Sequence, residues 1–419
     1  MKTRHTLSGG LGLLAAIAMA LPAAASMPTT ALTPSASVIA SADQATAGSA
    51  FAAPVPAASD DELREGNAGG EAVLTKEAKE AGLKAAGPKA TDQESLEAYW
   101  TPELMKSAKP ATSDPAYQKA VELFEEEQKQ LIESGEPDEE QTKQEGRERS
   151  VKGFAAPEFT RDGRVKRGNN ATGSTAPASR APMGLDVKTI LKAQYPQAVE
   201  RRSGKVFFTK PGVGNFVCSA SVVNSEGLDS VWTAGHCVHG GEDSSWFSNW
   251  TFAPDYANGL SPDGLWSARQ LWTKSDWAND SDFDEDMGVA IMNTRRGQHI
   301  VSRVGGQGFT VNKGKTTFEV AYGYPAEAPF NGQTLQRCWG TTSPEWSVWF
   351  TWSHTLKIPC TMTRGSSGGG WFDRYNWSSG TGYLNGVNSR INRIVGPTIM
   401  LSPYFDDSAW SLYNSTRNL

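Results

Sequence analysis

The chain has 419 residues and a formal net charge of −6 at pH 7. Residues 1–179 carry 19 basic and 26 acidic side chains, and residues 180–419 carry 21 and 20, so neither part offers the basic surface that nucleic-acid binding requires. Of the 14 tryptophans only Trp100 precedes Trp232, and all 4 cysteines follow residue 217, which predicts that the C-terminal part forms the folded core.

The N-terminus has the pattern of an export signal. Lys2 and Arg4 precede an apolar run from Leu11 to Leu21, and the small residues Ala23 to Ala25 follow it. This order is typical of a secretory signal peptide, predicted here for residues 1–25. The apolar run is short for a membrane span, and a membrane anchor is the alternative. We therefore expect a secreted, extracellular protein with no membrane contact once the signal is removed.

Residues 26–182 are predicted to form a pro-region and linker. The Ala-, Ser-, Thr- and Pro-rich segment 26–58 is typical of disorder. One helix is predicted from Gln93 to Ala108, and a second after Asp114-Pro115, which supplies a cap and a proline at the first helical position. The second helix carries an apolar stripe that needs a partner surface: Tyr117, Ala120, Val121, Phe124, Leu131 and Ile132.

The end of this region is predicted to be cut by a protease. Basic residues from Arg164 to Arg167 and a Gly-, Ala-, Ser- and Pro-rich stretch reach Pro182. Exposed linkers of this kind are where proteolytic cleavage concentrates, so we expect a cut between about residues 150 and 182. A permanent acidic, partly helical tail is the alternative.

Two predicted strands lead into a histidine. Residues 216–223 and 230–233 have strand-like patterns, and His236 follows them, between a glycine and a cysteine. A lone histidine after a strand is usually structural. His236 and His239 have a spacing that occurs in metal sites, but no further cluster of ligands completes such a site, so no metal is expected.

An acidic cluster runs directly into an apolar strand between Ser281 and Met292. Asp286 is the last acid before the strand, so we expect its side chain to be drawn into the core. A buried carboxylate needs hydrogen-bond partners, and an imidazole N–H is a suitable one. The acids before it are predicted to form a solvated turn, with a calcium site as the alternative.

A dense glycine run, Arg364 to Gly370, contains Ser366 and Ser367. Glycine permits positive φ and close approach of other groups. Such a turn leaves a serine hydroxyl exposed beside backbone N–H groups that can stabilise an oxyanion. A flexible linker is the alternative.

Three motifs together resemble the active-site motifs of trypsin- and chymotrypsin-like serine endopeptidases: Thr233-Ala234-Gly235-His236-Cys237, Asp286-Met287-Gly288-Val289-Ala290 and Gly365-Ser366-Ser367-Gly368-Gly369. They occur in the family's order, separated by 50 and 81 residues, within a region of about 200–419. The resemblance implies an all-β fold of two antiparallel six-stranded β-barrels in a peptidase domain, residues 183–419. A short C-terminal helix is predicted from Tyr404 to Tyr413.

The resemblance also implies roles for particular residues. His236, Asp286 and Ser367 would form the catalytic triad, and the backbone N–H groups of Gly365 and Ser367 would form the oxyanion hole. Substrates would be proteins or peptides, the pro-region would act in cis, and no cofactor is required. Cys218–Cys237 is the family's usual disulfide there, which leaves Cys338 to pair with Cys360.

Two departures from the family pattern bear on activation and specificity. Ser366 stands where the animal digestive enzymes carry an Asp that pairs with the new N-terminus, so the chain looks more like the bacterial branch that includes glutamyl endopeptidases. Thr361 replaces the Asp of trypsins in the specificity pocket, and Asn388 replaces the His of glutamyl endopeptidases. Arg364 and Arg390 are further candidates for charge in the pocket. The substrate side chain is therefore not predicted.

Two other classes of function are alternatives. A catalytically silent homologue would act as an extracellular binding module, although this chain keeps all three triad residues. A carbohydrate-binding protein would use exposed tryptophans to stack sugars, whereas core packing is the more common use of such residues. The tryptophans concerned are Trp246, Trp250, Trp266, Trp272 and Trp277.

Overall fold

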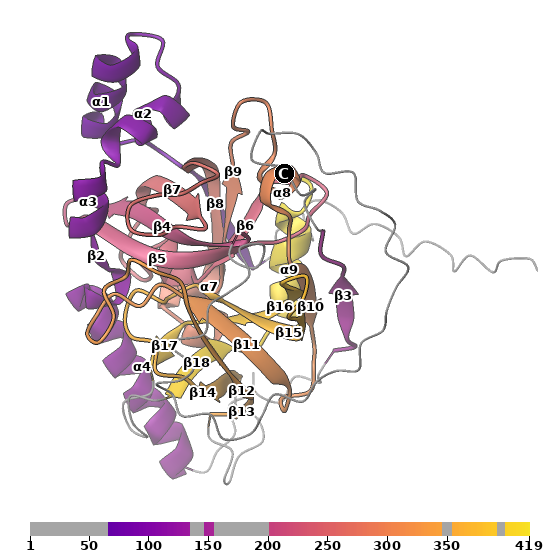
Figure 1. Cartoon of the computed structure of the whole chain (residues 1–419). Coiled ribbons are helices and arrows are strands. Elements are labelled where there is room, and N and C mark those ends of the chain that lie inside the picture. Colours follow the sequence, from indigo (N-terminus) through magenta and orange to yellow (C-terminus); the bar gives the residue numbers. More distant parts are fainter. Residues whose placement is uncertain (1–65, 135–145, 155–200, 346–353, 392–398) are drawn as a thin grey trace, which may run out of the picture. The chain divides into compact units, whose positions relative to one another are not determined.

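The structure, a computed structural model, describes residues 66–134, 146–154, 201–345, 354–391 and 399–419 (Figure 1). The predicted signal peptide, the low-complexity segment, most of the predicted linker and the start of the predicted peptidase domain at residue 183 lie outside these ranges. Within them, no helix is both long enough and apolar enough to cross a membrane.

Six antiparallel strands close into a barrel in the first half of the predicted peptidase domain. Hydrogen bonds join them in the order β8-β7-β4-β5-β6-β9, and β9 pairs back onto β8. This barrel confirms the strands predicted at 216–223 and 230–233. The strands are β4 (Ser203–Lys210), β5 (Gly214–Val222), β6 (Ser230–Thr233), β7 (Ser248–Pro254), β8 (Trp266–Lys274) and β9 (Gly288–Met292).

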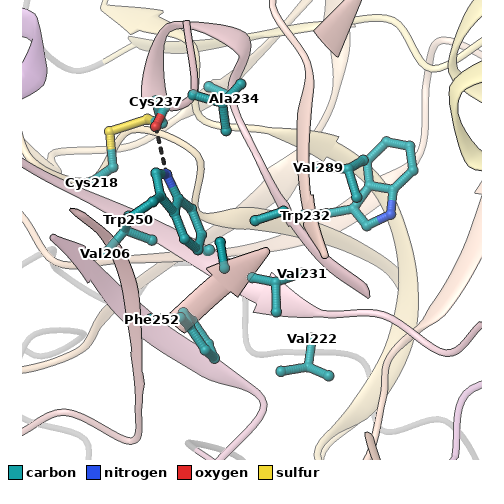
Figure 2. Close-up of a cluster of buried hydrophobic side chains, with 14 of the residues drawn as sticks. Val206, Cys218, Val222, Val231, Trp232, Ala234, Cys237, Trp250, Phe252 and Val289 are labelled. Carbon is teal, nitrogen blue, oxygen red and sulfur yellow. Dashed lines mark hydrogen bonds between the residues drawn. A yellow bond between two sulfur atoms is a disulfide. The ribbon is translucent and has the colours of Figure 1, made fainter. Parts of the chain in front are cut away.

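The barrel core reaches the segment that carries His236 (Figure 2). The Cys218–Cys237 disulfide ties β5 to the turn after β6. The indole Nε1 of Trp250 on β7 donates to the Cys237 carbonyl at 2.8 Å. Fully buried side chains such as those around Trp250 each contribute roughly 1.5–3 kcal/mol. The backbone next to His236 is therefore held by the core: Val206, Val222, Val231, Trp232, Phe252 and Val289.

The second half consists of two sheets over a shared core. One sheet has the order β12-β11-β15-β16-β10, and the other β13-β14-β18-β17. Their strands are β10 (Gly308–Val311), β11 (Phe318–Gly323), β12 (Gln336–Thr341), β15 (Gly370–Asn376) and β16 (Thr381–Val387), and β13 (Ser343–Pro344), β14 (Thr355–Pro359), β17 (Arg390–Ile391) and β18 (Ile399–Pro403).

The all-β class is confirmed, but the second half differs from the expected antiparallel six-stranded barrel. Among the described residues its strand pairings do not close into a ring, and β10 pairs with β16 in parallel. Side-chain packing holds the two sheets together instead, because Ala321, Leu356, Trp371 and Met400 share one buried cluster. The Cys338–Cys360 disulfide crosses from β12 to the end of β14. The structure thus contains both cysteine pairings that were expected.

The predicted C-terminal helix is confirmed as α9 (Asp407–Thr416), shifted by three residues. The helix starts later than Tyr404 because Asp406 caps it, accepting a hydrogen bond from the Ser408 backbone N–H at 2.8 Å. Tyr413 stacks on Phe309 of β10 with ring centroids 4.7 Å apart. The helix therefore packs through the aromatic side that the sequence indicated.

The region before residue 134 has more helices than the two expected: α1 (Lys76–Ala86), α2 (Asp92–Tyr99), α3 (Pro102–Ser107) and α4 (Pro115–Ser134). The single helix predicted from Gln93 to Ala108 is wrong, since it is broken into α2 and α3. Pro102 has no N–H to continue α2, and Thr101 caps the new helix by accepting from the Leu104 N–H. The helix after Asp114-Pro115 is confirmed, whereas α1 was not predicted.

Three short strands from the predicted pro-region and linker pair with the predicted peptidase domain. These are β1 (Asn67–Glu71) on β8, β2 (Lys109–Pro110) on β5 and β3 (Arg149–Val151) on β10. On β1, a Cβ at Gly69 would lie 2.7 Å from the Trp272 ring and one at Gly70 2.7 Å from the Trp246 ring. Only glycine permits this close contact.

Tryptophans join the two regions into one core. Trp100 is 1% exposed and its Nε1 donates to the Asn249 carbonyl at 3.0 Å. Trp250, Trp266 and Trp277 are equally buried. In this structure the five tryptophans considered for sugar stacking therefore pack in the core or, for Trp246 and Trp272, against β1.

A buried lysine on β4 should make stability depend on pH. Burial lowers the pKa of Lys205 to about 8, and its Nζ donates to the Gly332 carbonyl. Because the unfolded chain keeps this proton to higher pH, the free energy of unfolding should rise as pH increases from about 8 to about 10.5. Lys205→Met should abolish the rise and remove a penalty of up to roughly 3 kcal/mol at pH 7.

Urea unfolding at pH 7 and pH 10 measures this difference. Lys152→Met, at an exposed position, serves as the control and should leave the pH profile unchanged. A rise that survives in the Lys205→Met variant would contradict the assignment.

Candidate active site

His236 and Asp286 meet at one edge of the first barrel. β6 and β9 are antiparallel neighbours with Thr233 opposite Gly288, so the residues after β6 and before β9 lie close together. Asp286 Oδ1 accepts from the His236 backbone N–H at 2.8 Å, and Oδ2 lies 2.8 Å from Nδ1. The carboxylate therefore fixes both the backbone and the ring of His236, which leaves Nε2 as the unoccupied ring nitrogen.

A third donor to Asp286 comes from the second half. Ser389, directly after Asn388, donates its Oγ to Asp286 Oδ2 at 2.5 Å. Asp286 is fully buried, and a buried carboxylate is tolerated only when hydrogen bonds replace those it made to water. Sequence reasoning missed Ser389, because nothing in its local pattern points to an acid 103 positions away.

The glycine run is a tightly packed turn and not a linker. Gly368 has φ +75°, and a Cβ there would lie 2.0 Å from Thr233 Oγ1. Ser367 O accepts from the Ser219 N–H at 2.7 Å, next to the Cys218–Cys237 disulfide. Ser367 is thus held beside the segment that carries His236.

The structure does not join the predicted nucleophile and base by a hydrogen bond. His236 Nε2 is buried and has no hydrogen-bond partner among the described residues. The backbone N–H groups of Gly365 and Ser367 likewise donate to no acceptor in the described part of the chain. Three groups with unused hydrogen-bonding capacity therefore surround the predicted site.

The predicted specificity residues lie in different settings. Asn388 is 1% exposed, and its side chain bonds to the protein interior. Thr361 is half-buried just after β14. The Arg364 guanidinium lies 3.4 Å from Glu327, and Arg390 makes a bidentate pair with Glu345 at 3.1 and 2.8 Å. Both arginines thus have carboxylate partners.

The acids before Asp286 are less solvated than expected. Asp284 accepts from Thr355 Oγ1 at 2.6 Å, and Glu285 accepts from Ser408 Oγ. Burial raises the pKa of both carboxyl groups, that of Glu285 to about 8. The prediction of a solvated turn is wrong for these two residues, because α9 and β14 pack against the turn.

Helix α4 lies over this site. The Tyr117 ring centroid is 4.7 Å from that of His236, and the Tyr117 hydroxyl donates to the Ser389 carbonyl at 3.1 Å. About two turns further along the helix, the ring centroid of Phe124 lies 5.3 Å from that of Phe283 and 4.9 Å from the Arg390 guanidinium carbon. The apolar stripe seen in the sequence therefore covers the predicted catalytic histidine.

Comparisons with known proteins give the family. No protein-family model and no curated protein matches the chain. A thermostable serine protease, AL20, from an extremophilic microorganism is 39% identical over 52% of this chain and 98% of that chain, with a TM-score of 0.48. Protease Anisep from Arthrobacter nicotinovorans is 37% identical over 52% and 96%, with a TM-score of 0.49.

A Glu endopeptidase covers 55% of this chain and all of that one at 15% identity and a TM-score of 0.43, which is too distant to indicate specificity. The sequence identity of 39% across nearly the whole of AL20 shows the relationship by itself. The chain belongs to the chymotrypsin-like serine proteases, which are hydrolases.

Gly368 should tolerate no side chain. Gly368→Ala places a Cβ against Thr233 Oγ1 and the Ser219 carbonyl at a positive φ, which costs about 1–2 kcal/mol for the backbone alone. We expect thermal unfolding to show a loss of at least about 2 kcal/mol. Gly314→Ala, where a Cβ would meet nothing within 4 Å, should change stability by less than about 0.5 kcal/mol. Equal effects at the two glycines would contradict the packed turn.

Proposed function

We propose that the protein is a secreted serine endopeptidase, made as a precursor, with His236, Asp286 and Ser367 as its catalytic triad. The observation that carries the proposal is the pair of contacts at the Asp286 carboxylate, which accepts from the His236 backbone N–H and lies against His236 Nδ1. It selects the tautomer in which Nε2 is the basic nitrogen. A base with this tautomer next to the turn that carries Ser367 is the arrangement that nucleophilic catalysis by serine requires. Ser367 is 5% exposed in this structure, in which α4 lies over the site.

The chemistry follows in two halves. His236 Nε2 takes the Ser367 hydroxyl proton as Oγ bonds to the peptide carbonyl carbon, and Asp286 stabilises the resulting imidazolium. The C–N bond then breaks, and Nε2 gives the proton to the leaving amine. Nε2 then takes a proton from a water molecule as the water oxygen bonds to the acyl carbon. The C–Oγ bond breaks, and Nε2 returns the proton to Ser367 Oγ as the acid product leaves. The amides of Gly365 and Ser367 hold the oxyanion, each worth roughly 2.7–4 kcal/mol.

Export and maturation are part of the proposal. The signal peptide spans residues 1–25, the pro-region and linker 26–182, and the mature peptidase domain 183–419, with the cut between about 150 and 182. The two disulfides suit an oxidising extracellular compartment. Because β3 is paired to β10, the cut is expected after this strand, towards the basic and Gly-, Ala-, Ser- and Pro-rich stretch that ends at Pro182.

The pro-region would inhibit the enzyme by covering it. Tyr117 packs on the His236 ring and occupies the Ser389 carbonyl, so α4 must leave before a peptide reaches the triad. β1, β2 and Trp100 would supply the affinity that keeps α4 in place.

Ser367 should be the reactive nucleophile of the mature protein. Phenylmethylsulfonyl fluoride should label it, as read by mass spectrometry of its peptide. Ser367→Ala should lower kcat on a peptide library by on the order of 10⁶-fold with the melting temperature unchanged. A folded, mature protein that is neither labelled nor active would instead be the silent binding module.

The cleaved pro-region should inhibit the mature enzyme. N-terminal sequencing of the secreted enzyme should find a start between about residues 150 and 182, and a start near residue 27 would exclude a removable pro-region. In inhibition assays the released segment should lose at least about tenfold affinity with Tyr117→Ala, and also with Gly70→Val, which places a side chain against the Trp246 ring. Leu123→Ala, on the exposed side of α4, is the control and should inhibit normally.

A further inference from the structure

Asn388 uses its side chain inside the protein. Trp371 Nε1, which can only donate, lies 2.7 Å from Oδ1 and so fixes the orientation of the amide. Nδ2 donates to the Ser366 carbonyl at 2.9 Å and to the Tyr322 carbonyl at 2.8 Å. Both amide hydrogens are therefore spent on backbone carbonyls, and none remains to bind a substrate side chain.

The backbone of Asn388 holds the same glycine turn. Its N–H donates to the Gly369 carbonyl at 2.8 Å, and its carbonyl accepts from the Gly368 N–H at 2.7 Å. Together with the side-chain bond to the Ser366 carbonyl, Asn388 thus binds three backbone groups on both sides of Ser367. The Gly369 N–H also donates to the Ser366 carbonyl, at 3.0 Å.

Holding the Ser366 carbonyl sets the direction of the next N–H. The Ser366 carbonyl and the Ser367 N–H belong to one planar trans peptide, so they point in opposite directions. With the carbonyl drawn towards Asn388, the Ser367 N–H faces away from it, and it donates to no acceptor among the described residues.

The other oxyanion donor is set in the same way. The Arg364 carbonyl accepts from the Ala326 N–H at 2.7 Å, which turns the Gly365 N–H of that peptide to the opposite side. Gly365 has φ +98°, and a Cβ there would lie 2.9 Å from the Tyr324 carbonyl. The Arg364 carbonyl is thus held by a backbone N–H, whereas the Ser366 carbonyl is held in part by the Asn388 side chain. The Asn388 side chain can be replaced by mutation.

Ser366 itself supplies only a local bond, since its Oγ donates to the Thr363 carbonyl three residues earlier. Ser219 of β5 binds the Gly365 and Ser367 carbonyls, whereas the Ser366 carbonyl is bound to the interior through Asn388. These bonds are present while Tyr117 still lies on His236, so the turn is already held by them with α4 in place.

We infer that Asn388 is a positioning residue that presets the Ser367 N–H as an oxyanion donor, and is not a specificity residue. The inference rests on the proposed function. It implies that removing α4 uncovers a finished site and that no rearrangement of the turn is needed for activation.

The test compares two buried asparagines of nearly equal exposure. Asn388→Leu removes the side-chain bonds to the turn, and Asn385→Leu removes a bond to Glu319 that does not involve the turn. In mature enzyme, Asn388→Leu should lower kcat by between about 10- and 10³-fold with KM within about twofold of wild type. The inhibition constant of a peptidyl aldehyde, whose hemiacetal oxygen occupies the oxyanion hole, should rise by a similar factor. Asn385→Leu should change neither.

If the leucine variant does not fold, Asn388→Asp is measured at acid pH, where the carboxyl group keeps the acceptor for Trp371 and one donor. Relative to wild type at the same pH, Asn388→Asp should show a smaller fall in kcat than expected for Asn388→Leu. The fall relative to wild type should become larger as pH rises and the carboxyl group loses its proton. Unchanged kcat in folded Asn388 variants, or an equal fall in Asn385→Leu, would overturn the inference. A wild-type enzyme that is neither active nor labelled would instead refute the proposed function.

Discussion

The site depends on one buried carboxylate. Asp286 has no exposure to solvent, and it survives there because it receives the His236 N–H, faces His236 Nδ1 and receives the Ser389 hydroxyl. The first two contacts come from the same barrel as Asp286 and the third from the second half. Separating the two halves would leave a buried charge short of a hydrogen bond, at a cost of about 1–3 kcal/mol or more. The halves and the site therefore stabilise one another.

The glycine turn depends on the same contact between halves. Gly368 approaches Thr233 and Ser219 of the first barrel, and Asn388 holds the other side of the turn from the end of β16. Ser389, the next residue, holds Asp286. Ser389 thus supports the predicted base, His236, through Asp286. Its neighbour Asn388 supports the predicted oxyanion hole through the backbone of the turn. A small shift of Asn388 and Ser389 would therefore change the contacts at both Asp286 and the glycine turn.

The region before residue 134 shares the interior of the peptidase domain and is not merely laid on its surface. Trp100 lies in the same buried cluster as Phe207, and β1 completes the edge of β8. Among the described residues of this region, Tyr117 of α4 is the one whose ring packs on His236, whereas Trp100 and β1 pack on the barrel. Under the proposed function, α4 would block the site while Trp100 and β1 would supply affinity.

The sequence by itself determined the three motifs, the strands β5, β6 and β9 of the closed barrel, α4 and the C-terminal helix, because each depends on residues close together in the chain. The prediction of one helix from Gln93 to Ala108 was wrong, because Pro102 ends α2 and starts α3. Only the tertiary structure decided that Ser389 reaches Asp286, that Asn388 points into the interior, and that Asp284 and Glu285 lose water to α9 and β14. These outcomes depend on which surfaces meet after the chain folds, and no spacing along the sequence encodes that contact.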